Sequence, residues 1–423
     1  MSQADPRQAV RWLRNDYSRV PYWLYHDREI YRLEQERIFR GPTWSFVGLE
    51  AEIPNPGDYR TTFVGDTPVV LSRDKHGALH VFVNRCAHRG AIVRREARGN
   101  ADNHICIYHR WCYGQDGGLV GLPFRRGVRG NGGMSPDFRL EEHGLRKLRV
   151  VSRSGVVFAT FSEQCESLED YLGPVFTGHI DRIFKRPIRI LGYQRQRIAG
   201  NWKQYLENQR DNYHGSLLHE FQSTFGISRA TQEGGVSMDA RHRHNISWAR
   251  TGTDNDAEFS NLYKNDRVHD SSLRLLDTSM LRYLPEFEDR ISLAICGIFP
   301  NATIHQISNS IATRQVRTTG PGEFELHWTL LGYADDTEEM TQLRLLQANM
   351  VGPAGLISME DGEAIEITWR ASAPEPREAN QVIEMGGGGP IRNVSHRVSD
   401  IPVRGFWSYY AELMGMEPEN PER

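Results

Sequence analysis

The chain has only five cysteines among 423 residues, and it lacks several features that mark common classes of protein. No apolar run approaches the roughly 20 residues of a transmembrane helix, and the opening segment is polar where a secretory signal would be apolar. Lysine plus arginine number 51 against 54 aspartate plus glutamate, a net charge of −3. This balance gives no electrostatic reason to expect nucleic acid or an anionic membrane as a partner. We therefore expect a globular protein of two or three domains in the cytoplasm.

The cysteines do not form the pattern of a disulfide framework, but two of them belong to a second pattern. They stand in two short hooks, Cys86-Ala-His88 and, after 17 residues, Cys106-Ile-Tyr-His109. In a Rieske [2Fe–2S] cluster two cysteines hold one iron and two histidines hold the other. Structural zinc accepts the same atoms, but zinc sites usually pair Cys with Cys and His with His. The mixed hooks therefore favour a cluster, and a protein that moves electrons.

Apolar and turn residues divide the chain into three stretches, which together predict an α+β fold. Residues 1–40 are predicted to be helical, with aromatic and aliphatic side chains among charges. Residues 41–165 hold short apolar runs separated by Gly, Pro and Asp turns, which is typical of a small antiparallel β domain. Residues 166–423 are predicted to form a larger α+β domain. Its expected elements are a helix around 200–220, strands over 291–299 and 324–333, and helices over 337–349 and 406–414.

Further metal-binding side chains are expected on the helix around 200–220. Asp211 and His214 are three apart and would share one face of a helix. His214 and His219 are five apart, so both can bind one metal only where the helix loosens, and Gly215 is a suitable place. Two histidines with one carboxylate form the facial triad of non-haem Fe(II) oxygenases. Asp361, in the segment SMEDGE, is a candidate for the distant carboxylate.

The combined pattern is C-x-H-x17-C-x2-H followed, about a hundred residues later, by E-N-x2-D-x-Y-H-x4-H. It resembles the α subunit of Rieske-type aromatic ring-hydroxylating oxygenases. Respiratory Rieske proteins carry a further cysteine in each hook, at positions that are Ala91 and Tyr108 here, so the chain is similar to the oxygenase branch. The resemblance implies a Rieske domain over 41–165, a helix-grip-like catalytic domain over 166–423, and packing of 1–40 on the catalytic domain. It also implies two cofactors, one [2Fe–2S] cluster and one Fe(II) per subunit.

Roles for individual residues follow from the same resemblance. The cluster ligands would be Cys86, His88, Cys106 and His109, and the iron ligands would be His214, His219 and Asp361. Glu360 is the alternative to Asp361. Asn208 would lie near the iron without binding it. Asp211 would bridge His109 of one subunit to His214 of the next, because family members are trimers in which these two metals face each other.

The chain has no GxGxxG fingerprint in a strand–turn–helix setting, so electrons are expected from a separate reductase, through a ferredoxin. The oligomer implied is α3 or α3β3, with the presence of a small β subunit left open. In its overall sequence the chain is similar to oxygenases that act on carboxylated aromatic rings. The expected substrate is therefore a benzoate-class acid. Anthranilate 1,2-dioxygenation to catechol is the first choice, and terephthalate dioxygenation and salicylate hydroxylation are the alternatives.

Two arginines are expected to grip the substrate carboxylate, because a guanidinium is its natural bidentate partner. The resemblance assigns this role to Arg314 and Arg397. Mono- and dioxygenation both stay open, as does the ring position that is attacked. A distant alternative is an electron-transfer protein that uses only the Rieske domain. That alternative gives no role to the helix around 200–220.

Overall fold

The computed structural model describes residues 7, 10, 12–253, 256–262 and 272–418. The chain divides into two compact units, a larger one of Met1–Ile38 with Leu172–Arg423 and a smaller one of Phe39–Tyr171. The sequence predicts domain boundaries after residues 40 and 165. The division into these two units does not test those boundaries, which stay a prediction. Among the described residues, no helix has both the length and the apolar character that crossing a membrane requires.

The smaller unit is built on two antiparallel sheets. The strands of the first sheet, in spatial order, are β2 (Ser45–Leu49), β11 (Val156–Thr160), β10 (Lys147–Arg153), β5 (Leu79–Val83), β4 (Thr67–Arg73), β3 (Asp58–Val64) and β6 (Arg98–Asn100). The second sheet consists of β7 (Asn103–Ile105), β8 (Cys112–Gly114) and β9 (Leu119–Gly121). Short 3-10 turns lie at Glu50–Glu52 and Leu140–His143. Antiparallel strands joined by tight turns were predicted for this stretch, and the prediction is confirmed.

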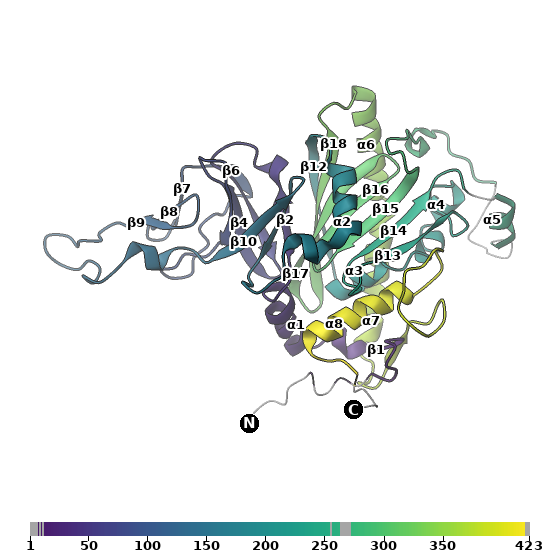
Figure 1. Ribbon diagram of the computed structural model, residues 1–423, viewed down its shortest axis with the longest axis horizontal. Helices are drawn as coiled ribbons and strands as arrows, with labels where there is room; N and C mark the ends of the chain where they lie inside the picture. The colour runs from purple at the N-terminus through teal and green to yellow at the C-terminus, as the bar shows by residue number, and fades with distance from the viewer. Residues whose placement is uncertain (1–6, 8–9, 11, 254–255, 263–271, 419–423) are drawn as a thin grey trace. The chain divides into compact units, whose positions relative to one another are not determined.

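The larger unit contains one seven-stranded antiparallel sheet, whose strands lie side by side in Figure 1. In spatial order they are β12 (Ile188–Ile198), β18 (Glu323–Tyr333), β17 (Ser310–Gly320), β16 (Ala302–Ile307), β15 (Ile291–Ile298), β14 (Asn245–Arg250) and β13 (Gly234–Met238). All six residues of β16 are buried, as expected where a central strand is covered on both faces. Helices and a sheet in one unit agree with the predicted α+β class.

Helices pack on this sheet and on one another. They are α2 (Leu168–Phe184), α3 (Trp202–Asn208), α4 (Glu220–Thr224), α5 (Asp256–Leu262), α6 (Glu338–Val351), α7 (Ser358–Ser372) and α8 (Ile401–Met414). The first of these, α2, runs across the division between the two units. Helix α6 lies on β17 and β18, α7 contacts β12, and α3 contacts both α7 and α8. Thr337 caps α6 by accepting a hydrogen bond from the Met340 amide, a usual device for starting a helix. Short 3-10 turns lie at Tyr22–Tyr25, His214–Ser216 and Ser279–Leu281.

The helical prediction for residues 1–40 is only partly correct. Helix α1 spans Arg28–Glu34 and continues as a π turn over Gln35–Phe39. Before it, Arg19–Pro21 forms strand β1, which pairs with β19 (Asn380–Val382). The proline explains the difference, since the residue before a proline is held in extended conformation. The first residues of the chain lie outside the described part.

The single helix expected around 200–220 is also broken. Helix α3 ends at Asn208, and the chain then passes through an irregular segment and a 3-10 turn at His214–Ser216 before α4 begins. The loosening was expected at Gly215 but begins earlier, directly after Asn208. Asp211 and His214 therefore do not share a regular helical face. The Nδ1 atom of His214 still lies 3.6 Å from Asp211 Oδ2.

Candidate metal centres

The two hooks of the smaller unit bring their imidazole rings together at its surface. The ring centroids of His88 and His109 lie 4.5 Å apart and nearly perpendicular. The two cysteines are buried, whereas His88 is exposed and His109 is half-buried. Neither Cys86 nor Cys106 is in a disulfide. Two inner sulfurs and two outer imidazoles are what a Rieske cluster needs, so these residues fit the cluster.

Backbone hydrogen bonds hold each hook in a tight turn. The amide of Cys86 donates to the Ala91 carbonyl at 2.8 Å, and the amide of Cys106 donates to the Trp111 carbonyl at 2.9 Å. The turn after the second hook places Arg110 at φ 59°, in the left-handed region that favours glycine. The arginine therefore adopts the backbone conformation that the turn requires, at some cost in strain.

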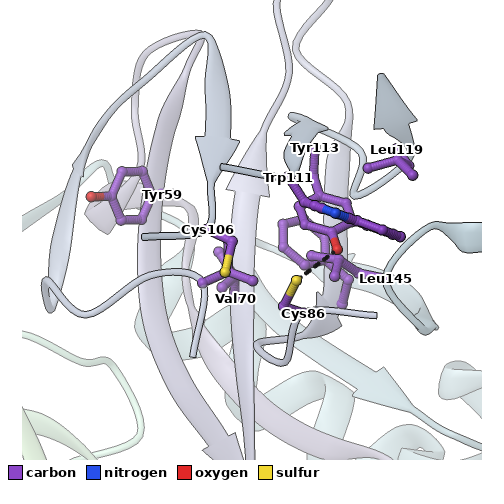
Figure 2. Close-up of a cluster of buried hydrophobic side chains, with 10 residues drawn as sticks. Tyr59, Val70, Cys86, Cys106, Trp111, Tyr113, Leu119 and Leu145 are labelled. Carbon is purple, nitrogen blue, oxygen red and sulfur yellow. Dashed lines mark hydrogen bonds between the residues drawn. The ribbon is translucent and has the colours of Figure 1, made fainter. Parts of the chain in front are cut away.

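Aromatic side chains surround the cluster position. Trp111 stacks on the His88 ring, with centroids 5.1 Å apart and planes 2° apart. Tyr113 is fully buried, and its hydroxyl lies 3.1 Å from Cys86 Sγ (Figure 2). Both aromatics belong to one buried core with Cys86 and Cys106. The sulfur ligands are therefore sheltered from water on their protein side.

The second centre lies in the larger unit, where three side chains converge. Ligand atoms of His214, His219 and Asp361 all lie within 4.8 Å of one another. Asp361 Oδ1 is 3.4 Å from His214 Nε2 and 3.2 Å from His219 Nε2. Two imidazoles and one carboxylate on one side of a metal make the facial arrangement that non-haem Fe(II) prefers. The donor set therefore fits Fe(II).

The outer nitrogens of both histidines face other carboxylates. His214 Nδ1 lies 3.6 Å from Asp211 Oδ2, and His219 Nδ1 lies 2.7 Å from Glu360 Oε2. The Glu360 carboxylate is close enough to accept from His219 Nδ1–H, which fixes the imidazole tautomer and turns Nε2 toward the metal. At 3.6 Å the Asp211 carboxylate acts on His214 through its charge and not through a hydrogen bond. Glu360 thus lies on the outer side of His219, and Asp361 lies among the ligand atoms. The geometry separates the two carboxylates that the sequence alone left as alternatives.

Electrostatics at this centre favour a positive charge. Burial alone would lower the pKa of His214, but interactions with the carboxylates of Asp211 and Asp361 raise this pKa to about 10. Burial would raise the pKa of Asp361, but hydrogen bonds and charges from His214 and His219 hold it well below its usual range. The acids therefore stabilise positive charge beside the imidazoles. A bound divalent cation would supply that charge.

Asn208, the last residue of α3, reaches the same centre. Its Nδ2 donates to Asp361 Oδ1 at 3.0 Å and lies 3.3 Å from His214 Nε2. Asn208 therefore helps to fix the Asp361 carboxylate. On the basis of the sequence, Asn208 is expected near the iron without binding it.

A cavity opens beside the three ligands and holds about 520 Å³ of space that is free of protein atoms, part of it open to solvent. The polar residues of its wall are Asn208, Gln209, Asn212, Gln222 and Ser228, and the apolar ones are Leu293, Ile295, Ile307 and Ile357. Both Arg314 and Arg397 line it, together with the ligand residues. The structure therefore brings the two predicted arginines to the predicted metal site.

Neutral groups hold each of these arginines. Arg314 Nε donates to His305 Nδ1 at 3.0 Å, and its guanidinium lies 4.2 Å from the centroid of the Trp328 ring. Arg397 Nη2 donates to Ser228 Oγ at 2.7 Å. Sequence reasoning missed these supports. His305 and Trp328 lie on strands β16 and β18, beside the Arg314 strand β17, and only the sheet register brings them together.

Comparisons with known proteins identify the family of the chain. Residues 43–131 match the model of the Rieske [2Fe-2S] domain, and residues 181–415 match the ring hydroxylating alpha subunit (catalytic domain). The chain is 48% identical to the anthranilate 1,2-dioxygenase large subunit of Burkholderia cepacia, with 97% of each chain covered. It is 43% identical to a terephthalate 1,2-dioxygenase alpha subunit of Comamonas sp., with 96% of this chain and 98% of the relative covered.

A salicylate 5-hydroxylase large oxygenase component of Ralstonia sp. is also 43% identical, over 96% of this chain and 97% of the relative. Among solved structures, naphthalene 1,2-dioxygenase from Rhodococcus sp. superimposes with a TM-score of 0.76 at 22% identity, with 95% of each chain covered. That likeness concerns the fold. The two matched families carry a [2Fe–2S] cluster and a non-haem Fe(II), whose donor sets are both present here. Because these matches span nearly the whole sequence, the chain belongs to the α subunits of the Rieske-type ring-hydroxylating oxygenases, which are oxidoreductases.

Proposed function

We propose that the chain is the terminal oxygenase subunit for a carboxylated aromatic ring of the benzoate class, with anthranilate (2-aminobenzoate) as first choice. Terephthalate and salicylate are the alternatives. Three of the relatives carry the names of these acids, and all three acids are benzoates. The expected reaction is 1,2-dioxygenation of anthranilate, with loss of ammonia and carbon dioxide, to catechol.

The observation that carries this proposal is a buried cation without an acidic partner. Arg314 is only 3% exposed and lines the cavity, yet no carboxylate among the residues in the described ranges forms an ion pair with it. Buried charges are normally paired, because removal from water is costly. Arg344 shows the usual solution in this chain, since it is buried against Glu286 and Asp336. An anionic ligand in the cavity would give Arg314 the partner it lacks.

The neutral supports of Arg314 preserve its charge for that ligand. His305 is fully buried, and burial together with the neighbouring arginine holds its pKa well below the usual value. A neutral imidazole can accept from Arg314 Nε without cancelling the positive charge. A carboxylate in the place of His305 would form an internal ion pair and weaken the attraction for an acid substrate.

The metal-binding residues supply the rest of the proposed site. His214, His219 and Asp361 would hold Fe(II), and Cys86, His88, Cys106 and His109 would hold the cluster. When bound, the cluster supplies single electrons and the iron provides the place where dioxygen is reduced. Apolar residues from β15 and β16 form one wall of the cavity and suit the face of an aromatic ring. The arginines would fix the orientation of that ring.

The proposal also covers the oligomer and the partner proteins that deliver electrons. Enzymes of this family oligomerise and receive electrons from ferredoxin or reductase partners. We propose an α3 or α3β3 oligomer in which Asp211 connects His214 to His109 of the partner subunit. The contact of Asp211 with His214 supports its half of that connection. The small β subunit and the cytoplasmic location stay predictions.

Substitution of the arginines tests the substrate class. Arg314→Gln and Arg397→Gln should each raise KM for 2-aminobenzoate roughly 10- to 100-fold, the usual effect of losing a hydrogen bond to a charged group. Both variants should keep their full iron and sulfide content. Arg195→Gln, on the exposed part of β12, is the matched control. An unchanged KM in both cavity variants would contradict the proposed carboxylate clamp.

A further inference from the structure

The cavity wall contains a buried amide whose hydrogen-bonding capacity is unused. Gln209 follows the last residue of α3, lines the cavity and is only 5% exposed. Neither its Oε1 nor its Nε2 has a hydrogen-bond partner among the residues that the structure describes. A buried polar group left without a partner costs as much as a lost hydrogen bond. Such a group beside a ligand cavity is expected to find its partner in the ligand.

The backbone around this side chain is firmly held. The Gln209 carbonyl accepts hydrogen bonds from Asn245 Nδ2 at 3.2 Å and from Ser247 Oγ at 3.0 Å. Both donors lie on β14 and are fully buried. The main chain of Gln209 is therefore fixed to the sheet, and its carboxamide is the part left unbound.

The neighbouring strand leaves room for that carboxamide. Leu293, Ile295 and Gly297 alternate along β15 and so face the same side of the sheet. The first two line the cavity, whereas the third has no side chain. A Cβ on Gly297 would lie 2.8 Å from Gln209 Oε1, closer than real side chains approach. Because Gly297 has no side chain, the Gln209 amide can occupy the space beside Leu293 and Ile295 on the face of the sheet that lines the cavity.

We propose that Gln209 recognises the amino or hydroxyl group next to the carboxylate on the substrate ring. This inference rests on the proposed function. The amide oxygen accepts from the N–H of an arylamine or the O–H of a phenol, while Arg314 binds the carboxylate. The site then selects 2-amino- and 2-hydroxybenzoates over a 1,4-dicarboxylate, which carries no donor at that position.

A purely internal role is the competing explanation. Asn245 Oδ1 also lacks a partner among the described residues and would lie 2.4 Å from the same added Cβ on Gly297. Rotation of the Gln209 amide could direct its Nε2 to this oxygen. In that case the two amides satisfy each other, and the substrate makes no contact with Gln209. The test must therefore separate ligand affinity from stability.

Binding measurements with three closely matched ligands separate an effect on ligand affinity from an effect on protein stability. The iron-replete oxygenase is titrated anaerobically in a calorimeter with 2-aminobenzoate, with benzoate and with 2-methylbenzoate, which has the shape of the first but no donor. Wild type should bind 2-aminobenzoate more tightly than 2-methylbenzoate. Gln209→Met keeps the length of the side chain and should weaken 2-aminobenzoate about fivefold, within the usual net worth of one hydrogen bond. Its affinity for the other two ligands should not fall.

The outcomes distinguish this inference from the function on which it rests. If wild type binds none of the three acids, the proposed function fails. If wild type binds them but shows no preference for the amine, or if Gln209→Met weakens all three equally, the role of Gln209 is overturned and the function stands. Iron content and melting temperature identify a misfolded variant, and Gln209→Leu then replaces it. A lower melting temperature with an unchanged ligand preference would support the pair with Asn245.

Discussion

The hydroxyl of Tyr113 lies 3.1 Å from Cys86 Sγ and accepts a hydrogen bond from the Ala87 amide at 3.0 Å (Figure 2). A cysteine that binds iron does so as a thiolate and carries no proton, so the Tyr113 hydroxyl would be the donor to the sulfur. Burial and the nearby cysteines raise the pKa of Tyr113 well above its usual value, so the proton is retained. The first hook therefore receives a hydrogen bond from a residue four positions after the second hook.

This contact predicts that Tyr113→Phe lowers the reduction potential of the cluster. A hydrogen bond to a ligand sulfur stabilises the reduced, more negative cluster. A net worth of about 1 kcal/mol corresponds to roughly 40 mV for a one-electron couple. A redox titration followed by electron paramagnetic resonance measures the shift. Tyr59→Phe is the control, because Tyr59 belongs to the same core with its hydroxyl pointing away from both cysteines (Figure 2). Equal potentials for wild type and Tyr113→Phe would contradict the assigned role.

Different metal contents are predicted for variants of the two adjacent carboxylates. Asp361→Ala should lose the mononuclear iron and keep the cluster, because Asp361 faces Nε2 of both histidines. Glu360→Gln should retain a bound iron with roughly 10- to 100-fold weaker affinity, because Glu360 only orients His219. Iron and acid-labile sulfide per chain measure both effects. Loss of iron from Glu360→Gln alone would reverse the assignment.

A buried ion pair predicts a large effect on stability away from the metals. Lys203 Nζ lies 2.5 Å from Glu34 Oε1, and the side chains are 1% and 0% exposed. Trp202 and Tyr410 also donate to this carboxylate. Lys203→Met should cost roughly 3–5 kcal/mol, because it leaves a buried charge without its partner. The double variant with Glu34→Gln should recover part of this loss in denaturant unfolding. If the double variant is no more stable than Lys203→Met, the two side chains do not act as a pair.

The buried His179 is expected to make the folded protein less stable in mild acid. Burial, with the charge of Arg182, lowers the pKa of this histidine from 6.5 to about 3. Above pH 6.5 both the folded and the unfolded chain hold it neutral, so it adds no pH dependence. Below pH 6.5 only the unfolded chain takes up the proton, and stability falls by about 1.4 kcal/mol per pH unit, down to the folded pKa.

Replacement by glutamine isolates this contribution. Between pH 7.5 and pH 5.5, wild type should lose about 1.4 kcal/mol more than His179→Gln, because roughly one unit of that interval lies below the unfolded pKa. Urea midpoints at the two pH values measure the difference. Parallel losses in both proteins would show that His179 does not titrate on unfolding.

Local spacing made much of the chemistry predictable from the sequence. Each hook is a short turn in which the ligands are two or three residues apart, so Cys86 and His88 meet whatever the rest of the fold does. His214 and His219 are similarly close in the chain. The sequence predicts that these two histidines bind one metal, but it does not predict the path of the backbone between them. Asn208, where the helix ends, donates a hydrogen bond to Asp361, a contact across 153 positions that local spacing does not reveal.

Contacts between distant segments were the part that the sequence could not supply. Glu360 and Asp361 are neighbours with the same chemistry, and only the direction of α7 decides which one faces the metal side of the histidines. His305 supports Arg314 because β16 and β17 pair in one particular register. Strand β1 exists because residues near 380 offer it a partner. In each case tertiary packing selects among local alternatives that the sequence leaves equivalent.

The product formed from 2-aminobenzoate tests the central claim most directly. The iron-replete oxygenase, supplied with a reductase, NADH and ¹⁸O₂, should convert 2-aminobenzoate to catechol that carries two ¹⁸O atoms, with release of ammonia and carbon dioxide. Mass spectrometry of the product reads both its identity and its label. Failure to oxidise any benzoate-class acid, while a neutral aromatic hydrocarbon is oxidised, would contradict the proposed function.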